Sequence, residues 1–444
     1  MSKNERNLIV FIHPGFVDGS IPYPPYESLS LASYAENHGL DVMIIDQRVE
    51  PNWEQRLINV IDEVLWVGLT VITGPQILSA LKTSGVIKEM RHDVPIVWGG
   101  WHPTFLPEQT IKHPLVDYVV AGIGELKIIE LSQHIKNGEV DVLNNKAILH
   151  KNGNHSYVIE KESFAGLDKL PAYHLINIES YRSKNNIAGM ITARGCPFSC
   201  SFCTVAQIAY INREIDTVIN EIQFLINENK FQKIIFSDGL FFAQKKRVLQ
   251  LFDKLKEKEV FFDFKGSMRP NTLRKWSDEE IERLKEAGLV AVNVGVETGS
   301  PKMLKKIKKD VAIEDVLHLA KITGKYDIEL TAAFMCGLPN ETVDDLKQTI
   351  DLIHRILDSN SKIRILNPFY MPLPGAPSYH EIIRLGWKPP KTLEEWALRN
   401  KYNISHEEVE PFPWLDREDF DLYMKTFRNS ILNELRLQDA IGKQ

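Results

Sequence analysis

Three cysteines lie close together in the stretch RGCPFSCSFCT, residues 194–204, with the spacing C-x3-C-x2-C. Cys196, Cys200 and Cys203 are three of only four cysteines in 444 residues, so composition alone does not explain their clustering. Four thiolates would close a structural zinc site or ligate an iron-sulfur cluster completely, whereas three leave one metal position open for another ligand. We therefore expect a metal centre with one open coordination position.

A structural zinc site and a disulfide are the alternatives to such a centre. Zinc would need a fourth ligand, and the nearest histidines, His174 and His318, are not at ligand spacing. A disulfide is disfavoured because the chain opens Met-Ser-Lys-Asn-Glu-Arg, without the apolar segment that precedes exported proteins. The fourth cysteine, Cys336, lies in an apolar run and is predicted to be a small core residue.

The cysteine motif resembles that of the radical SAM superfamily, whose C-x3-C-x-aromatic-C loop holds a [4Fe-4S] cluster by three irons. Phe202 occupies the aromatic position. The resemblance implies that Cys196, Cys200 and Cys203 are the metal ligands and catalytic residues. It also implies that the fourth iron chelates the amino and carboxylate groups of S-adenosylmethionine (SAM), with Phe202 near that cofactor.

Length and composition limit the other possibilities. A chain of 444 residues is expected to form two or three domains. No apolar run approaches the roughly 20 residues needed to span a bilayer, and a net charge of -6 argues against generic nucleic-acid binding. The basic run at residues 302–309 (KMLKKIKK) is expected to be a solvated helix face. We expect a cytoplasmic protein with neither a membrane span nor a nucleic-acid partner.

Strand and helix patterns alternate five times in the first 137 residues. Short, nearly continuous apolar runs predict strands that are buried on both faces of a parallel sheet. The predicted strands are residues 7–13, 41–45, 65–71, 95–98 and 118–120. This alternation predicts an α/β fold with a doubly wound, Rossmann-like sheet, whose ligands bind beyond the carboxyl ends of its strands.

Glycines follow three successive strands of this sheet, so the backbone there can lie close against something large and flat. The first strand lacks the G-x-G-x-x-G signature of a nicotinamide-binding fold. The turns resemble those of the cobalamin-binding domain that precedes the radical SAM domain in one large branch of the superfamily. A Pro-Pro loop, a Thr-Gly-Pro-Gln turn, a Gly-Gly-x-His-Pro-Thr turn and a Gly-x-Gly-Glu turn occur here in the same order.

This resemblance implies that the turn residues bind cobalamin. The implied contacts are Tyr23, Pro24, Thr73, Gly74, Gln76, Gly99, Gly100, His102, Thr104, Gly124 and Glu125. The D-x-H-x-x-G stretch that supplies a cobalt ligand in classical cobalamin enzymes is missing, and the family pattern places His102 at the corrin periphery. The alternative is a flavodoxin-like domain that binds nothing, since fold alone does not fix function.

A second series of strands and helices begins near residue 187. The predicted strands are residues 190–193, 233–236, 260–265, 290–296, 329–335 and 363–369. Resemblance to the radical SAM core implies a partial (β/α)6 barrel with its functional groups at the carboxyl ends of the strands. The turn Gly-Leu-Pro-Asn-Glu-Thr at residues 337–342 resembles one of the superfamily, with Asn340 where a second glycine is usual. Asparagine also tolerates positive φ.

The predicted organisation has four parts. Residues 1–137 form the Rossmann-like cobalamin-binding type of domain, and residues 138–184 form a connector with a small hairpin at residues 147–150 and 156–159. Residues 185–385 form the partial barrel. A mostly helical C-terminal extension, residues 386–444, is expected to cover the mouth of the barrel and to contribute to the substrate pocket.

Four polar residues follow barrel strands at places where the resemblance implies contacts with SAM. Ser237 and Asp238 are expected to receive its methionyl ammonium, which suits an anion with a neighbouring hydroxyl. Arg269 is expected to pair with the SAM carboxylate, and Glu297 to bind the ribose or methionyl part. The alternative for each charged residue is an ordinary structural ion pair.

The resemblance implies a cobalamin-dependent radical SAM enzyme. Such an enzyme would methylate an unactivated carbon of a small-molecule or natural-product substrate through a 5'-deoxyadenosyl radical and methylcobalamin. An electron donor such as flavodoxin or ferredoxin is the expected partner. One alternative is an enzyme of the same architecture that catalyses deoxygenation, cyclisation or rearrangement, with or without cobalamin. Another is a non-enzymatic iron-sulfur or zinc scaffold.

Overall fold

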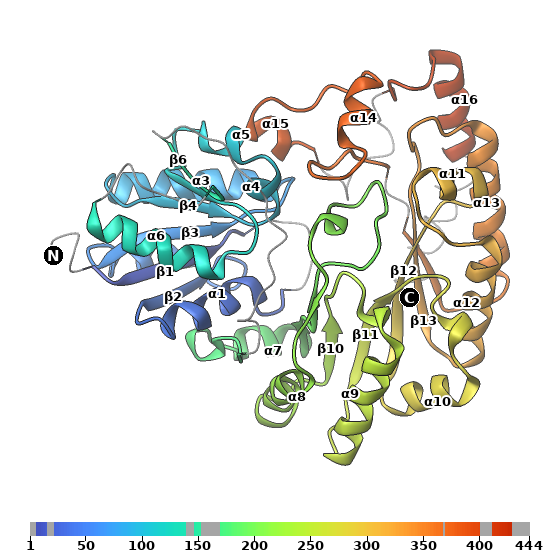
Figure 1. Cartoon of the computed structure of the whole chain (residues 1–444), viewed down its shortest axis with the longest axis horizontal. Coiled ribbons are helices and arrows are strands. Elements are labelled where there is room, and N and C mark those ends of the chain that lie inside the picture. The colour runs from blue at the N-terminus through green and yellow to red at the C-terminus, as the bar shows by residue number, and fades with distance from the viewer. Residues whose placement is uncertain are drawn as a thin grey trace. The chain divides into compact units, whose positions relative to one another are not determined.

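The computed structural model describes residues 6–15, 22–138, 146–151, 169–366, 369–399 and 411–428. The chain divides into two compact units, which Figure 1 draws in a colour ramp along the sequence. The first unit comprises Met1–Gly189, Asp216–Phe231 and Pro390–Asn400. The second comprises Met190–Ile215, Gln232–Pro389 and Lys401–Gln444. The chain therefore returns twice to the first unit after leaving it.

The first unit is built on a six-stranded sheet with the order β2-β1-β3-β4-β5-β6. Its strands are β1 (Leu8–His13), β2 (Asp41–Asp46), β3 (Val64–Thr70), β4 (Ile96–Gly99), β5 (Tyr118–Val120) and β6 (Ile148–His150). Adjacent strands from β2 to β5 are parallel, and β6 is antiparallel to β5. The predicted doubly wound domain is confirmed. Of the predicted connector hairpin, the first arm is β6 and the second lies outside the described residues.

Helices connect the strands of this sheet, and one more, α7, follows its last strand. They are α1 (Tyr26–Glu36), α2 (Trp53–Ile58), α3 (Gln76–Met90), α4 (Trp101–Phe105), α5 (Pro107–Ile111), α6 (Glu125–Asn137) and α7 (Glu179–Asn185). Leu29 and Ala32 of α1 and Ile77 and Ala80 of α3 are fully buried. The i, i+3 spacing of each pair places both side chains on one face of their helix, which packs into the core.

Two later segments belong to the first unit. One carries α8 (Ile215–Gln223) with the π-turn Phe224–Glu228, and the other carries α15 (Leu393–Ala397). The hydroxyl of Tyr173 donates a hydrogen bond to Oε1 of Glu221 on α8 at 2.8 Å, and the Tyr173 ring stacks on Phe224. Helix α15 packs against α3. Sequence periodicity placed both segments with the barrel and its extension, because it carries no information on long-range packing.

The second sheet has the order β14-β13-β12-β11-β10-β7, so its strands follow one another in chain order. They are β7 (Ile187–Met190), β10 (Lys233–Phe236), β11 (Asp263–Met268), β12 (Leu289–Glu297), β13 (Glu329–Phe334) and β14 (Ile363–Leu366). The pairings from β10 to β14 are all parallel. A two-stranded antiparallel ribbon, β8 (Ala193–Arg194) with β9 (Ile211–Asn212), flanks the cysteine loop. The predicted six-stranded partial barrel is confirmed.

Helices alternate with these strands, and several begin with a capped N-terminus. They are α9 (Lys245–Glu257), α10 (Asp278–Glu286), α11 (Pro301–Lys306), α12 (Ile313–Lys325), α13 (Val343–Leu357), α14 (Tyr379–Arg384) and α16 (Arg417–Phe427). Ser277, Ser300 and Thr342 accept hydrogen bonds from backbone N–H groups in the first turns of α10, α11 and α13. Among the described helices, none has the length and apolar character that crossing a bilayer requires.

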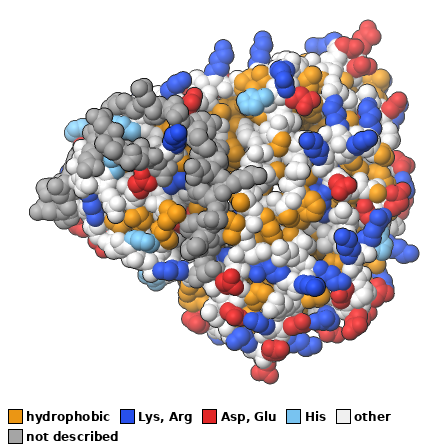
Figure 2. Space-filling view, in the orientation of Figure 1, with side chains coloured by type: hydrophobic (Ala, Val, Ile, Leu, Met, Phe, Trp, Pro, Cys, Tyr) orange, Lys and Arg blue, Asp and Glu red, His pale blue; other side chains and the backbone are white. Residues whose placement is uncertain are grey.

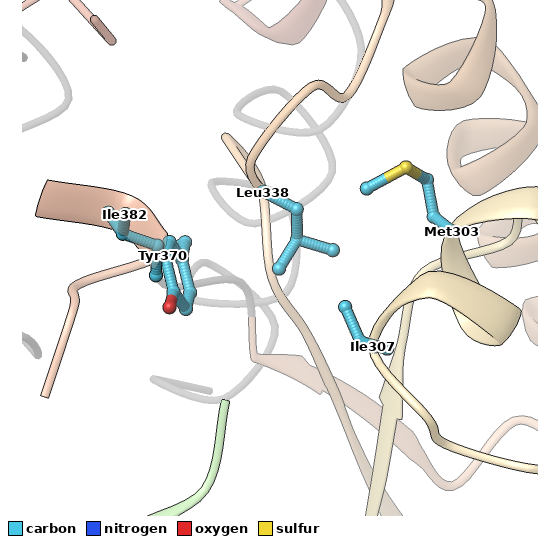
Figure 3. Packing of buried hydrophobic residues seen from close by; sticks show 5 residues of the cluster. All are labelled: Met303, Ile307, Leu338, Tyr370 and Ile382. Atoms are coloured by element: carbon cyan, nitrogen blue, oxygen red, sulfur yellow. The ribbon is translucent and has the colours of Figure 1, made fainter. Parts of the chain in front are cut away.

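A cluster of apolar side chains lies where the last three strands of the second sheet end. Figure 3 shows its buried members, Met303, Ile307, Leu338, Tyr370 and Ile382. They come from α11 and its C-cap, from the turns that follow β13 and β14, and from α14. Phe202 of the cysteine loop packs against the same cluster. The cysteine loop therefore packs against apolar side chains from segments that lie more than a hundred residues later in the sequence.

The turn after β13 is held by a buried carboxylate. Oε2 of Glu341 accepts hydrogen bonds from the N–H groups of Gly337 at 2.7 Å and Leu338 at 3.2 Å, and from the hydroxyl of Tyr423 on α16 at 2.6 Å. Burial raises the pKa of Glu341 to about 7, although these donors oppose the shift. Asn340 has a φ of +59°, the positive value expected for this turn. The carboxylate thus fastens α16 to the barrel.

Replacing Tyr423 by Phe removes the hydroxyl that fastens α16. We expect the free energy of unfolding of the second unit to fall by about 1–3 kcal/mol, because the buried carboxyl group of Glu341 loses a hydrogen-bond partner. Denaturant unfolding of the purified chain measures the change. Tyr379→Phe is the control, because Tyr379 is also a buried tyrosine but within the described residues its hydroxyl makes no hydrogen bond. Equal effects of both substitutions would contradict the assigned role of Tyr423.

Candidate active site

The cysteine loop begins after β7 and carries three free thiols. Cys200 is buried, and Cys196 and Cys203 are half-buried. Burial raises the pKa of the Cys196 and Cys203 thiols, while backbone N–H groups near each sulfur act in the opposite direction. In the metal-free chain these thiols are therefore protonated, and binding of metal must release their protons. Within the described residues, no group of three or more His, Cys, Asp or Glu side chains is arranged to hold a single metal ion.

Arg269 reaches the cysteine loop from the end of β11. Its Nη1 donates to Sγ of Cys200 at 3.5 Å, and the guanidinium lies 3.9 Å from the ring centroid of Phe198. Its Nη2 donates to the carbonyl of Asp310 at 3.5 Å, and its buried Nε has no partner in the described part of the chain. Arg269 therefore places a positive charge in direct contact with a thiol of the cysteine loop. The predicted contact between Arg269 and the SAM carboxylate stays a prediction.

Glu297 ends β12 and forms a buried ion pair. Its Oε1 accepts a hydrogen bond from Nζ of Lys309 at 2.6 Å, and both side chains are less than a tenth exposed. Its φ of +73° is unusual for a residue other than glycine, so the backbone that carries this carboxylate is locally strained. Nζ of Lys309 also lies 5.8 Å from the ring centroid of Phe202. The pair therefore borders the cysteine loop, and the predicted contact of Glu297 with SAM stays a prediction.

Asp238 holds the base of the cysteine loop. Its Oδ1 accepts hydrogen bonds from the N–H groups of Thr192 at 2.6 Å and Ala193 at 3.0 Å, and its Oδ2 accepts one from the Thr192 hydroxyl at 2.6 Å. Burial raises the pKa of Asp238 to about 6. Both oxygens are thus engaged by the segment that leads into the loop. Contact of Asp238 with the SAM ammonium stays a prediction, as does that of Ser237, which is exposed.

In the first unit, the turns after β3, β4 and β5 lie at one edge of the sheet because these strands are parallel neighbours. Thr73 Oγ1 and His102 Nδ1 share a hydrogen bond of 3.1 Å, which joins two of the turns. Thr104 Oγ1 accepts a hydrogen bond from the N–H of Gly122 at 2.9 Å, which joins the second turn to the third. The side chain of Gln76 accepts from the N–H of Ile72 at 2.8 Å. Most of the predicted cobalamin residues are therefore brought together.

The remaining predicted residues of this edge have varied surroundings. Glu125 is buried and accepts a hydrogen bond from Ser30 Oγ at 3.1 Å. Gly100 has a φ of +94°, and a Cβ there would lie 2.9 Å from the backbone of Val71, so the turn itself requires glycine. The ring of Tyr23 lies where Gly189 has no side chain. Pro24 and Gly74 are buried, and Gly99 and Gly124 are half-buried.

A polar cluster at the ends of β1 and β2 was missed by sequence reasoning. Asp46 accepts hydrogen bonds from Nη2 of Arg48 at 2.6 Å and from the hydroxyl of Tyr181 at 2.9 Å. Burial lowers the pKa of the adjacent His13 to about 4, and Arg48 contributes to the decrease. The sequence offered one signal for this cluster, because His13 and Asp46 are polar residues at the carboxyl ends of apolar strands. It offered no signal for Tyr181, whose partner Asp46 lies 135 residues away along the chain.

The residues present suit the groups that the resemblance implies. Nε2 of His102 and Nδ1 of His13 are buried, and neither has a hydrogen-bond partner within the described residues. Buried polar atoms are normally paired, and the amide side chains of a corrin would supply partners at this edge. The loop carries three free thiols, one of them in contact with Arg269, and three thiols are the number that an iron-sulfur cluster with one open position would need. The chemistry of the residues present at both places therefore fits the expected cofactors.

Comparison with protein families agrees with this arrangement. A model of the B12 binding domain matches residues 21–132, and a model of the radical SAM superfamily matches residues 190–353. The chain is a radical SAM enzyme with a B12-binding domain. Its cofactors are a [4Fe-4S] cluster, SAM and cobalamin.

Individual relatives extend over most of this radical SAM enzyme. An uncharacterized methyltransferase of Pyrococcus horikoshii is 27% identical over 84% of this chain and 82% of its own length. The anaerobic magnesium-protoporphyrin IX monomethyl ester cyclase of Rubrivivax gelatinosus is 26% identical over 98% of this chain and 79% of its own length. The structure of the radical SAM methyltransferase TsrM from Kitasatospora setae, with cobalamin and [4Fe-4S] cluster bound, superposes with a TM-score of 0.70. It is 20% identical and covers 85% of this chain and 78% of TsrM, which shows a shared fold.

Replacing Cys200 by Ala removes one of the three thiols of the loop. We expect anaerobically reconstituted Cys200→Ala to lose the visible absorbance of an iron-sulfur cluster, because two thiolates hold it poorly. Cys336→Ala is the matched control, since Cys336 is also a buried free cysteine but lies outside the loop. Ultraviolet-visible spectra with iron and sulfide content measure both. Retained absorbance in Cys200→Ala, or its loss in both variants, would contradict the ligand assignment.

Replacing Asp238 by Asn tests whether this carboxylate positions the loop. An amide presents N–H groups to the donors of Thr192 and Ala193, so we expect cluster affinity to fall by about 10- to 100-fold, as for other groups that orient ligands. Iron and sulfide content during stepwise reconstitution measures the affinity. Asp344→Asn, on the exposed face of α13, is the control. The assignment fails if the two variants load cluster equally well.

Proposed function

We propose that this enzyme transfers a methyl group to an unactivated carbon of a small-molecule or natural-product substrate. The observation that carries the proposal is the pairing in one chain of a three-thiol loop with a B12-binding domain. Two further observations support it. A methyltransferase of Pyrococcus horikoshii aligns over most of the chain, and TsrM, a methyltransferase, shares its fold.

When bound, the cluster supplies the electron that cleaves SAM to a 5'-deoxyadenosyl radical, and cobalamin supplies the methyl group. The chain contributes placement and exclusion of water. Asp238 fixes the base of the cysteine loop, and Phe202 anchors its outer part on the apolar cluster. Arg269 and Lys309 place two cations beside the loop, which suits a centre of negative charge and the carboxylate of SAM.

A cyclase is the second candidate. The cyclase of Rubrivivax gelatinosus aligns with 98% of this chain, although it is named for ring closure and not for methyl transfer. The residues that surround the cysteine loop do not separate the two outcomes, because both begin with removal of a hydrogen atom. The identity of the product distinguishes them.

Anaerobic incubation with cobalamin, a reductant and SAM labelled with deuterium in its methyl group tests the proposal. We expect 5'-deoxyadenosine together with a product that carries the labelled methyl group, detected by mass spectrometry in a substrate library. Cys200→Ala should yield neither compound. Formation of 5'-deoxyadenosine with a product that has gained no label would overturn methyl transfer in favour of the cyclase.

The proposal includes an acidic electron-donor protein of the flavodoxin or ferredoxin class, and hence a location in the cytoplasm. A basic rim formed by Lys302, Lys305, Lys306 and Lys308 supports this partner. All four lysines are exposed, and Figure 2 shows Lys and Arg side chains gathered over the region that α11 occupies. The N–H of Ser201 donates to the carbonyl of Ile307 at 3.0 Å, so the rim lies beside the cysteine loop.

The charge of the rim contrasts with that of the whole chain, whose net charge is -6. The net charge of the chain gives an acidic donor no general attraction, and a local cluster of lysines within the Debye length of about 8 Å would steer it to the loop. A hollow next to the rim is lined by Ser201, Phe202, Lys306 and Lys308, so the donor would dock against the cysteine loop itself.

Charge reversal separates donor docking from catalysis. We expect the triple variant Lys305→Glu, Lys306→Glu, Lys308→Glu to lose about tenfold or more of its flavodoxin-driven rate at low salt, with the difference shrinking as salt rises. Its dithionite-driven rate should be unchanged. The matched control reverses Lys254, Lys256 and Lys258 at the C-terminal end of α9, which leads into β11. An equal loss with dithionite, or no loss with flavodoxin, would overturn the docking surface.

A further inference from the structure

A segment of the C-terminal part is bound to the first unit through side-chain hydrogen bonds. We call residues 390–399, which include α15, the strap. Trp396 Nε1 donates to Oε1 of Gln109 at 2.9 Å, and Nε2 of Gln109 donates to the carbonyl of Pro390 at 3.2 Å. His113 Nε2 lies 3.3 Å from Oε1 of Glu394. Figure 1 shows α15 next to α4 and α5, although more than 280 residues separate the partners along the chain.

The strap contacts the turns that are predicted to bind cobalamin. Trp396 is completely buried, and its ring meets the ring of His102 edge to face with centroids 5.8 Å apart. His102 in turn shares its hydrogen bond with Thr73. A Cβ on Gly74 would lie 3.5 Å from the carbonyl oxygen of Arg399. The strap therefore lies against both the turn after β3 and the turn after β4.

The contact fixes the orientation of His102. Its ring is held on one side by the indole of Trp396 and at Nδ1 by Thr73, and among the described residues its buried Nε2 has no hydrogen-bond partner. Burial lowers the pKa of His102 to about 4, so the ring is neutral at physiological pH. A neutral ring in fixed orientation offers a single, directed hydrogen-bonding atom. Without Trp396 the ring would lose the packing that sets this direction.

We propose that the strap is an integral part of the cobalamin site and that Trp396 is a positioning residue for it. Trp396 holds His102, and through it the Thr73 hydroxyl, in the arrangement that receives the corrin. This inference extends the proposed function and depends on it only for the identity of the cofactor, cobalamin. Removal of the strap from the first unit weakens cobalamin binding without altering the three-thiol loop of the second unit.

Titration of the full-length chain with hydroxocobalamin, followed by absorbance, tests the inference. We expect Trp396→Ala to bind cobalamin at least about tenfold more weakly than the wild-type chain, as when a group that orients a ligand is lost. Trp396→Phe keeps an aromatic edge against His102 and should recover most of the affinity. Iron and sulfide content should be the same in all three proteins. Trp387→Ala, in the part of the extension that belongs to the second unit, is the matched control.

A double-mutant cycle distinguishes positioning from general stabilisation. If Trp396 acts through His102 and Thr73, its removal should have little further effect on cobalamin affinity in a Thr73→Val background. If it only stabilises the fold, the two effects should add. Gln109→Ala, which releases the strap but leaves every cofactor turn intact, serves where Trp396→Ala does not fold and should also weaken binding.

Any one of four results would overturn the inference. The first two are wild-type affinity in Trp396→Ala and equal weakening by Trp387→Ala. The others are additive effects in the double-mutant cycle and unchanged binding by Gln109→Ala. Binding is measured without substrate or turnover. A failure of methyl transfer would therefore leave this result untouched, and a failure of the strap would leave the proposed reaction untouched.

Discussion

The hydrogen bonds from the cysteine-loop base to Asp238 are the constraint on which the second unit depends. Two backbone N–H groups and one hydroxyl converge on a carboxylate that is removed from water. Burying this group costs free energy, as its raised pKa of about 6 indicates, and the three donors offset part of that cost. The result is a fixed point at the start of the loop. A loop anchored there can present three sulfurs to a cluster repeatedly in the same arrangement.

The surroundings of the loop are organised by charge as well as by packing. Arg269 contacts Cys200, and Lys309 lies over Phe202 while it neutralises Glu297. A buried ion pair adds little net stability, because desolvation costs about as much as the pairing provides. Its value here is geometric, since it places a cation beside the loop. In the first unit the strap plays the corresponding part, because it holds the turns that are predicted to bind cobalamin.

Much of the fold was predictable from the sequence because short apolar runs mark buried parallel strands. The predicted bounds of β5 and β10 agree with the structure, and Asn340 has the positive φ that its turn requires. The cysteine spacing predicted the metal centre, since the chemistry is local. Long-range contacts were not predictable. The spacing of the five lysines in residues 302–309 does not identify Lys309 as the buried one. The sequence of the C-terminal extension likewise does not identify Trp396 as a residue of the first unit.

The central claim is that three protein thiolates leave one iron of the cluster open to SAM. Electron paramagnetic resonance of the reduced, reconstituted enzyme, recorded with and without SAM, tests this most directly. The account predicts a [4Fe-4S] signal whose g-values shift when SAM is added, because the cofactor binds the open iron. A signal that SAM leaves unchanged, or a protein that carries zinc and no sulfide, would contradict it.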